Sequence, residues 1–93
     1  MKVRFEWDEG KAAANASRHG VSFNEAATVF SDTLSWTYPD REHSVGERRW
    51  ITIGLSEERR ILVVAHSEES EIVRIISARP ATRKEQRFYE EER

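Results

Sequence analysis

The sequence predicts an α+β fold in which helices pack against an antiparallel sheet, with the element order β-α-α-β-β-β-β-α. The first observation behind this prediction is an alternation of apolar and polar residues along several short segments, typical of half-buried strands. The second is a pair of capping-box sequences, each of which marks the start of a helix. The third is a series of strands joined by short polar links, as in hairpins.

Length and composition limit the possible classes of protein. The 93 residues suit a single domain spanning residues 1–93. There are no cysteines, which excludes a disulfide framework and a thiolate metal site. No apolar run approaches the roughly 18 residues of a membrane span, so we expect a cytoplasmic protein that does not bind membranes. The net charge of -2 argues against nonspecific binding along duplex DNA, which needs a broad basic face.

The first third of the chain is expected to hold one strand and two helices. Residues 2–7 alternate as a strand, and Asp8 is a suitable N-cap for the alanine-rich segment 9–19. Gly20 then occupies the position where a left-handed residue ends a helix. A capping box at residues 22–25 opens the second helix, whose apolar residues recur on one face. That face consists of Phe23, Ala26, Ala27 and Phe30.

Four strands and a helix are expected in the rest of the chain. Residues 33–38 alternate as a strand, and a polar loop follows at residues 39–47. Three further strands are expected at residues 49–56, 60–67 and 72–79. Because residues 61–65 are all apolar, the strand that contains them should be central and covered on both faces. The last helix begins at the capping box 82–85, after Pro80.

The last strand and helix carry a local concentration of positive charge. Residues 74–89 contain five basic residues and one acidic residue, a balance of +4 in a chain with a net charge of -2. Basic side chains in the first half of a helix oppose its dipole by about 0.3–1 kcal/mol each, so helix stability does not explain them. Arginine presents a planar fork of donors that matches phosphate. We therefore interpret this region as an anion site, and the alternative is a solvated helix with incidental charges.

Two further features of the sequence leave alternatives open. Arg74 and Arg79 fall on opposite faces of the expected strand, so both line one site only if a bulge intervenes or if Arg79 lies past the strand end. The three histidines, His19, His43 and His66, lack the spacing of metal ligands. We therefore expect no metal and no cofactor.

A set of residues spread along nearly the whole chain matches a family pattern. They are Phe5-Glu6-Trp7-Asp8, Lys11, His19-Gly20-Val21-Ser22-Phe23, Val29-Phe30, His43-Ser44, Glu47, Arg49, Arg74-Ile75-Ile76-Ser77-Ala78-Arg79, Ala81, Glu85 and Tyr89. This pattern resembles that of the BrnT family of type II toxins, and the block at residues 74–79 is its most specific part. The resemblance implies a RelE-like fold and a ribonuclease that cleaves mRNA and thereby inhibits translation and growth. It also implies a cognate ribbon-helix-helix antitoxin that neutralises the toxin, with operator DNA bound only through the toxin–antitoxin complex.

The residues fit metal-independent RNA cleavage, which needs a base for the 2′-OH proton, cations for the phosphorane charge and an acid for the leaving oxygen. The candidate catalytic residues are Glu47, Arg49, Arg74, Arg79 and Tyr89. The candidate substrate-binding residues are Lys11, His43, Arg83 and Arg87. Either Glu47 or His43 is the expected base, the three catalytic arginines stabilise phosphate, and Tyr89 acts as the acid or stacks on a base. The alternatives are that Tyr89 only packs the last helix against the core and that Glu47 only pairs with Arg49. The alternative function is a non-catalytic module that binds protein or nucleic acid, an inactive toxin homologue acting only in a partner complex.

Overall fold

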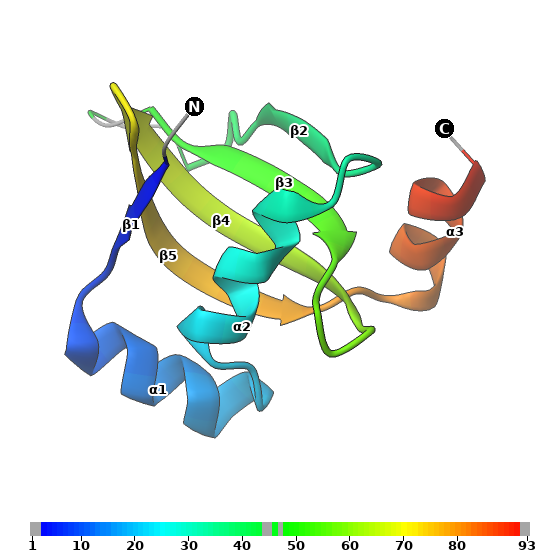
Figure 1. Cartoon of the computed structure of the whole chain (residues 1–93), viewed down its shortest axis with the longest axis horizontal. Helices are drawn as coiled ribbons and strands as arrows, with labels where there is room; N and C mark the ends of the chain where they lie inside the picture. Colours follow the sequence, from blue (N-terminus) through cyan, green and yellow to red (C-terminus); the bar gives the residue numbers. More distant parts are fainter. Residues whose placement is uncertain (1–2, 44–45, 47, 92–93) are drawn as a thin grey trace.

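The computed structural model describes residues 3–43, 46 and 48–91 of the chain. Figure 1 shows one sheet, with two helices between its first and second strands in the sequence and a third helix after its last strand. The elements are β1 (Arg4–Glu6), α1 (Glu9–His19), α2 (Phe23–Thr28), the 3₁₀ turn η1 (Val29–Ser31), β2 (Trp36–Pro39), β3 (Trp50–Leu55), β4 (Ile61–Glu69), β5 (Ile72–Pro80) and α3 (Arg83–Glu91). The predicted order of helices and strands is the observed one, with boundaries that differ by a few residues.

The five strands form one sheet in the order β1-β5-β4-β3-β2. Neighbours among β2 to β5 are antiparallel, as predicted, and β4 is central, as its apolar sequence indicated. The prediction of an antiparallel sheet is wrong for β1, which pairs with β5 in parallel. After β1 the chain passes through two helices before it returns to the sheet, so no hairpin turn determines the direction of β1 relative to its neighbour.

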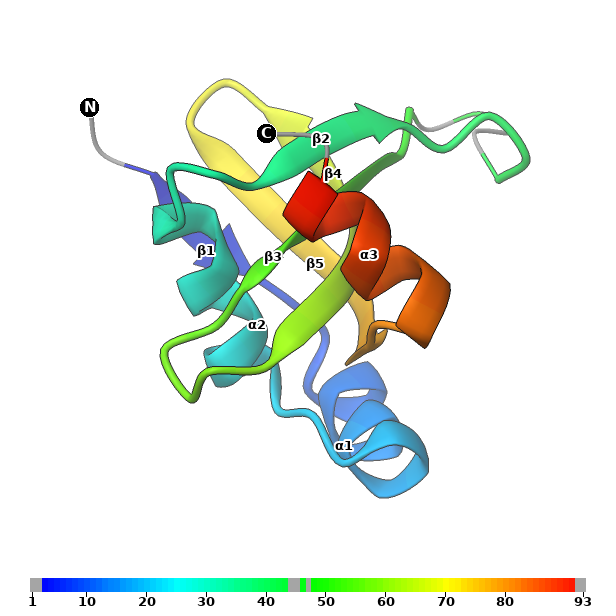
Figure 2. The same ribbon diagram turned by 90° about the vertical axis from the view of Figure 1, so that its right-hand side faces the viewer.

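Helices cover the two faces of the sheet unequally. On one face α1 and α2 enclose the larger core, which includes Phe23, Leu62 and Ile75. On the other face α3 contributes Tyr89 to a smaller cluster with Ile53 and other strand residues. Figure 2 shows α3 in front of the strands, away from α1. We call the sheet face opposite α1 and α2 the open face, because α3 covers only part of it. Among the described helices, none is long and apolar enough to cross a membrane.

The predicted helix starts are present, but the two capping boxes differ. In α3 both bonds form, since Glu85 N–H donates to Thr82 Oγ1 at 3.1 Å and Thr82 N–H donates to Glu85 Oε1 at 2.9 Å. In α2 only the Ser22 hydroxyl accepts, from the Glu25 N–H at 3.0 Å. The Glu25 carboxylate instead accepts from the Arg60 guanidinium and from the Ser56 hydroxyl, which ties α2 to the β3–β4 turn.

A buried asparagine joins α1 to the sheet. Asn15 is 6% exposed, and its amide donates to the carbonyls of Val21 and Ala78 at 3.0 and 2.8 Å. Its Oδ1 accepts from the Ala78 N–H at 3.1 Å. Buried backbone groups without partners are costly, so this side chain stabilises the contact between α1 and β5. In the sequence it is one polar residue in an alanine-rich helix, without a distinguishing pattern.

His66 is a buried titratable group in the larger core. Its side chain is fully buried, its ring lies edge-on to Phe30 with centroids 4.8 Å apart, and Nε2 is hydrogen-bonded to the Thr52 hydroxyl at 2.7 Å. Burial lowers the pKa of His66 to about 4, because the charged imidazolium loses its solvation. The Glu68 carboxylate lies 3.4 Å from Nδ1 but is half exposed, so water screens its attraction for a proton.

Because His66 is buried in its neutral form, we expect the protein to lose stability in mild acid. In the unfolded chain a histidine takes up a proton near pH 6.5, whereas folded His66 does so only near pH 4. Between these values the unfolded state binds more protons, so the free energy of unfolding falls by about 3 kcal/mol as the pH drops from 6.5 to 4. Urea unfolding at several pH values should show this slope. It should flatten in His66→Gln but persist in the control His19→Gln, and an unchanged slope in His66→Gln would contradict the assignment.

Candidate active site

A β-bulge determines which residues of β5 reach the open face. Ala65 of β4 pairs with Ser77, but His66 pairs with Ile75, so Ile76 is an extra residue in β5. As a result Ile75 and Ala78, three positions apart, both belong to the core under α1 and α2. The residues that alternate with them, Arg74 and Arg79, therefore both point to the open face. Of the alternatives left by the sequence, the bulge is the one observed.

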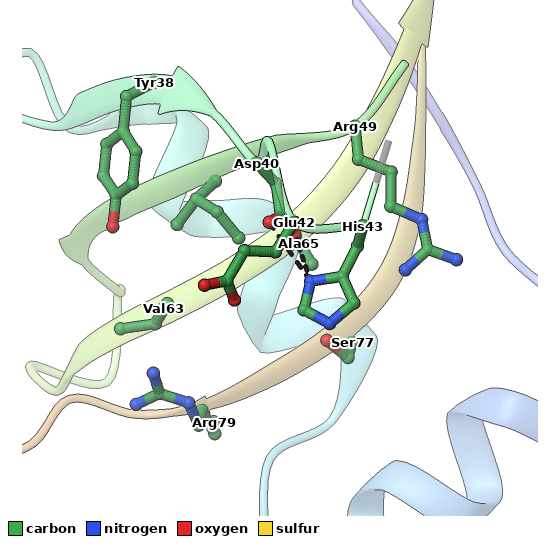
Figure 3. Close-up of a pocket in the computed structure, with 10 residues that line it drawn as sticks. Tyr38, Asp40, Glu42, His43, Arg49, Val63, Ala65, Ser77 and Arg79 are labelled. Atoms are coloured by element: carbon green, nitrogen blue, oxygen red, sulfur yellow. Dashed lines mark hydrogen bonds and ion pairs between the residues drawn. The ribbon is translucent and has the colours of Figure 1, made fainter. Parts of the chain in front are cut away.

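A pocket of about 450 Å³ lies on this face, at the end of the sheet that α3 leaves uncovered. Its floor is formed by apolar residues of β3 and β4, and charged residues of the loop between β2 and β3 and of β5 stand around it (Figure 3). The lining residues are Tyr38, Asp40, Glu42, His43, Arg49, Ile51, Val63, Ala65, Ser77 and Arg79. The pocket therefore brings together three sequence-predicted site residues from separate segments, namely His43, Arg49 and Arg79.

Arg79 is held in a fixed orientation by Glu85. Two guanidinium nitrogens of Arg79 donate to the two carboxylate oxygens of Glu85, each at 2.8 Å. The hydrogen bonds from Arg79 lower the pKa of Glu85 to about 2, and the same pairing raises the pKa of Arg79. Both groups therefore stay charged at neutral pH. Because Glu85 also caps α3, the orientation of the guanidinium at the pocket depends on the start of that helix.

His43 is oriented by a neighbouring carboxylate. Its Nδ1 lies 3.2 Å from both oxygens of Asp40, and the Asp40 N–H donates to the Arg49 carbonyl at 2.9 Å. A neutral imidazole that donates its Nδ1 proton to a carboxylate keeps a lone pair on Nε2. In Figure 3 the ring extends from the loop toward Ser77, with Arg49 on the same side of the pocket. In the part of the chain that the structure describes, no group of His, Asp or Glu side chains has the arrangement of a metal site.

The other predicted charged residues that the structure describes do not line this pocket. Glu47 lies outside the described residues. Arg74 is on the open face but near β1, where its Nη1 is 3.8 Å from the Glu6 carboxylate. Lys11 is exposed on α1, which packs against the opposite face. On α3 the buried Tyr89 marks the inner side, and helical spacing puts Arg83 and Arg87 on the outer side, where both are exposed.

Tyr89 has a structural position that differs from the catalytic one predicted. It is 4% exposed, packs in the smaller core and donates its hydroxyl proton to Asp32 Oδ2. The same carboxylate oxygen accepts the Leu55 N–H at 2.8 Å, so Tyr89 helps to fasten α3 to the end of β3. A phenol buried in this way cannot reach a substrate in the pocket. Of the roles considered for Tyr89, the structure favours packing of the last helix over that of acid or stacking residue.

Most of the pocket residues, among them Tyr38 and Ser77, are not among the predicted site residues. Tyr38 stands at the β2 side of the pocket, and burial raises the pKa of its hydroxyl, with a further contribution from Glu85. Ser77 lies two residues before Arg79 on the same face of β5. Side chains alternate between the two faces of a strand, so the sequence places Tyr38 on the same face as Trp36 and Ser77 on the same face as Arg79. This alternation was the sequence feature that could have identified both residues.

Comparison with known proteins identifies the family of the chain. A family model described as "Ribonuclease toxin, BrnT, of type II toxin-antitoxin system" matches residues 7–85. The chain belongs to the BrnT family. The crystal structure of the BrnT ribonuclease toxin of Brucella abortus is similar, with 22% sequence identity and a TM-score of 0.67. The match covers 88% of this chain and 100% of that one, and at this identity it shows a shared fold. No curated protein sequence matches the chain.

Membership of the BrnT family gives the pocket a biochemical setting. Ribonuclease toxins of type II systems act on RNA and have an antitoxin as their partner. The matched residues 7–85 include the pocket residues His43, Arg49 and Arg79, together with Glu85. Most of α3, including Arg87 and Tyr89, lies beyond the matched part.

Proposed function

We propose that this BrnT-family chain is an endoribonuclease that cleaves mRNA in the pocket on the open face, without a metal ion. The observation that supports the proposal is the convergence of His43, with its Asp40 partner, and two arginines over one apolar floor. A phosphodiester bound there would meet a base on one side and fixed positive charge on the other. This combination is what internal cleavage of RNA requires.

The reaction that fits these groups is attack of a ribose 2′-oxygen on the adjacent phosphorus. His43 Nε2 removes the 2′-OH proton, and Asp40 stabilises the imidazolium that results. Arg49 and Arg79 stabilise the phosphorane charge. The bond from phosphorus to the 5′-oxygen breaks, and that oxygen takes a proton from the Tyr38 hydroxyl, which lines the same pocket. The products are a 2′,3′-cyclic phosphate and a free 5′-OH. Glu47 is the second candidate for the base.

The partners and setting proposed with this activity follow from the family. A cognate antitoxin with a ribbon-helix-helix domain neutralises the toxin, and operator DNA is bound only through their complex. The fold is proposed to be RelE-like, since two helices precede an antiparallel meander and a third follows it. The site of action is the cytoplasm, where mRNA is translated.

Purified wild-type protein tests the activity directly. We expect it to cleave end-labelled single-stranded RNA in the presence of EDTA and to leave a cyclic phosphate. It should not cleave the same oligonucleotide with 2′-deoxyriboses, because the attacking oxygen is then missing. Added antitoxin should stop the cleavage, and expression in growing cells should arrest growth. If the folded protein leaves RNA and growth unaffected, the ribonuclease proposal fails and the chain is a non-catalytic binding module.

A further inference from the structure

A second groove, of about 630 Å³, adjoins the pocket on the open face, between β2 and α3. We call it the aromatic groove and define it by Trp36 and Tyr38 of β2 together with Lys84 and Phe88 of α3. Trp36 and Tyr38 are two positions apart and therefore on the same side of the strand. Lys84 and Phe88 are four positions apart and therefore on the same side of the helix.

The aromatic groove exposes more apolar surface than packing of the fold requires. Trp36 is 38% exposed, Tyr38 42% and Phe88 39%, although the smaller core lies directly beneath them. The rings of Trp36 and Phe88 have centroids 5.7 Å apart and are tilted by 54°, so they touch without stacking face to face. Large aromatic rings grouped and exposed in this way are typical of sites where a further planar or apolar group binds.

The groove is continuous with the proposed active site. Tyr38 lines both, and Glu85, which borders the aromatic groove, holds Arg79 at the pocket. Lys84 adds a positive charge on the α3 side of the aromatic groove. A ligand that runs from one hollow into the other therefore meets aromatic rings and cations in turn. Single-stranded nucleic acid has this alternation, with a flat base and a phosphate in every nucleotide.

We propose that the aromatic groove binds an unpaired RNA base next to the cleaved phosphate, by stacking on Trp36 and Phe88, while Lys84 contacts a neighbouring phosphate. This inference rests on the ribonuclease activity proposed above and adds the form of its substrate. A base inside a duplex has both faces covered by its neighbours, so the groove selects single-stranded RNA. Because every base has a flat face, stacking contributes affinity with little dependence on sequence.

The test measures binding of an RNA that cannot be cleaved. The probe is a short single-stranded 2′-O-methyl oligonucleotide, compared with an abasic oligonucleotide of equal length and with the probe annealed to its complement. We expect the wild type to bind the single strand more tightly than either control. Trp36→Ala and Phe88→Ala should each weaken binding by roughly 5- to 150-fold, the range for loss of one stacked base. Their affinity for the abasic oligonucleotide should hardly change.

Matched variants separate stacking from general effects on the fold. Trp36→Phe keeps an aromatic face and should retain most of the affinity, whereas Trp36→Leu keeps apolar area and should lose it. Leu34→Ala is the control, since Leu34 is 45% exposed near the start of β2 but does not line the groove. Circular dichroism and thermal unfolding establish that each variant is folded.

The outcomes distinguish this inference from the activity on which it rests. If the wild type cleaves RNA and the Trp36 and Phe88 variants bind the probe as tightly as it does, the aromatic groove is not a base site. If these variants keep their RNA affinity but lose affinity for the antitoxin, the groove is a protein-docking surface and the inference is wrong. If the wild type neither binds nor cleaves single-stranded RNA, the proposed ribonuclease function fails as well.

Discussion

Replacement of Arg79 by alanine is expected to lower the rate of RNA cleavage by about 10²–10³-fold, the usual effect of removing one preorganised charge or donor from a reacting oxyanion. The guanidinium is oriented by its two bonds to Glu85 and is 40% exposed at the pocket, so the N–H groups that Glu85 does not occupy can donate to a phosphate. Arg79→Lys keeps the charge but loses the planar fork, and we expect it to recover only part of the rate. Single-turnover cleavage of a labelled oligonucleotide measures the effect.

Arg74 provides the matched control for this prediction. It lies on the same strand and the same face as Arg79, is 46% exposed and also faces a carboxylate, but it does not line the pocket. Arg74→Ala should therefore cleave RNA at nearly the wild-type rate. A strong loss in Arg74→Ala together with full activity in Arg79→Ala would move the active site to the β1 edge of the open face. Thermal unfolding of both variants shows whether a loss of cleavage rate arises from a loss of stability.

Replacement of His43 by alanine is expected to lower the cleavage rate by about 10²–10⁴-fold, the typical contribution of a general base. Asp40→Asn should have a smaller effect on the rate, since Asp40 acts by orienting and stabilising the imidazole. RNA affinity, measured with the 2′-O-methyl probe, should change less than the rate in both variants.

The same experiment decides between the two bases that the sequence left open. Glu47→Gln should cleave RNA at nearly the wild-type rate if His43 is the base. If His43→Ala retains full activity and Glu47→Gln loses it, the base is Glu47 and the His43–Asp40 pair has a structural or binding role. His19→Ala is a suitable control, because His19 lies at the end of α1 on the other side of the sheet.

The sequence was a reliable guide to secondary structure and a partial guide to the site. Asp8, Gly20 and Thr82 have the capping roles predicted for them, since a cap involves residues only a few positions apart. Glu25 shows where prediction from neighbouring residues fails, because its carboxylate accepts from the distant Arg60 and not from the backbone N–H at the start of α2. Tyr89 shows it again, since its partner Asp32 is 57 positions away.

The sequence by itself determined the α+β class, the order of the elements, the central position of β4 and the grouping of basic residues near the C-terminus. These features depend on local periodicity and composition, which are complete within a short window of residues. Only the tertiary structure decided which side chains share a site. The extra residue Ile76 in β5 exists only relative to the partner strand β4, and it turns Arg79 toward the same face as Arg74. Contacts between distant segments likewise buried Tyr89 and brought His43 and Arg49 to Arg79, because the packing of the folded chain sets such distances.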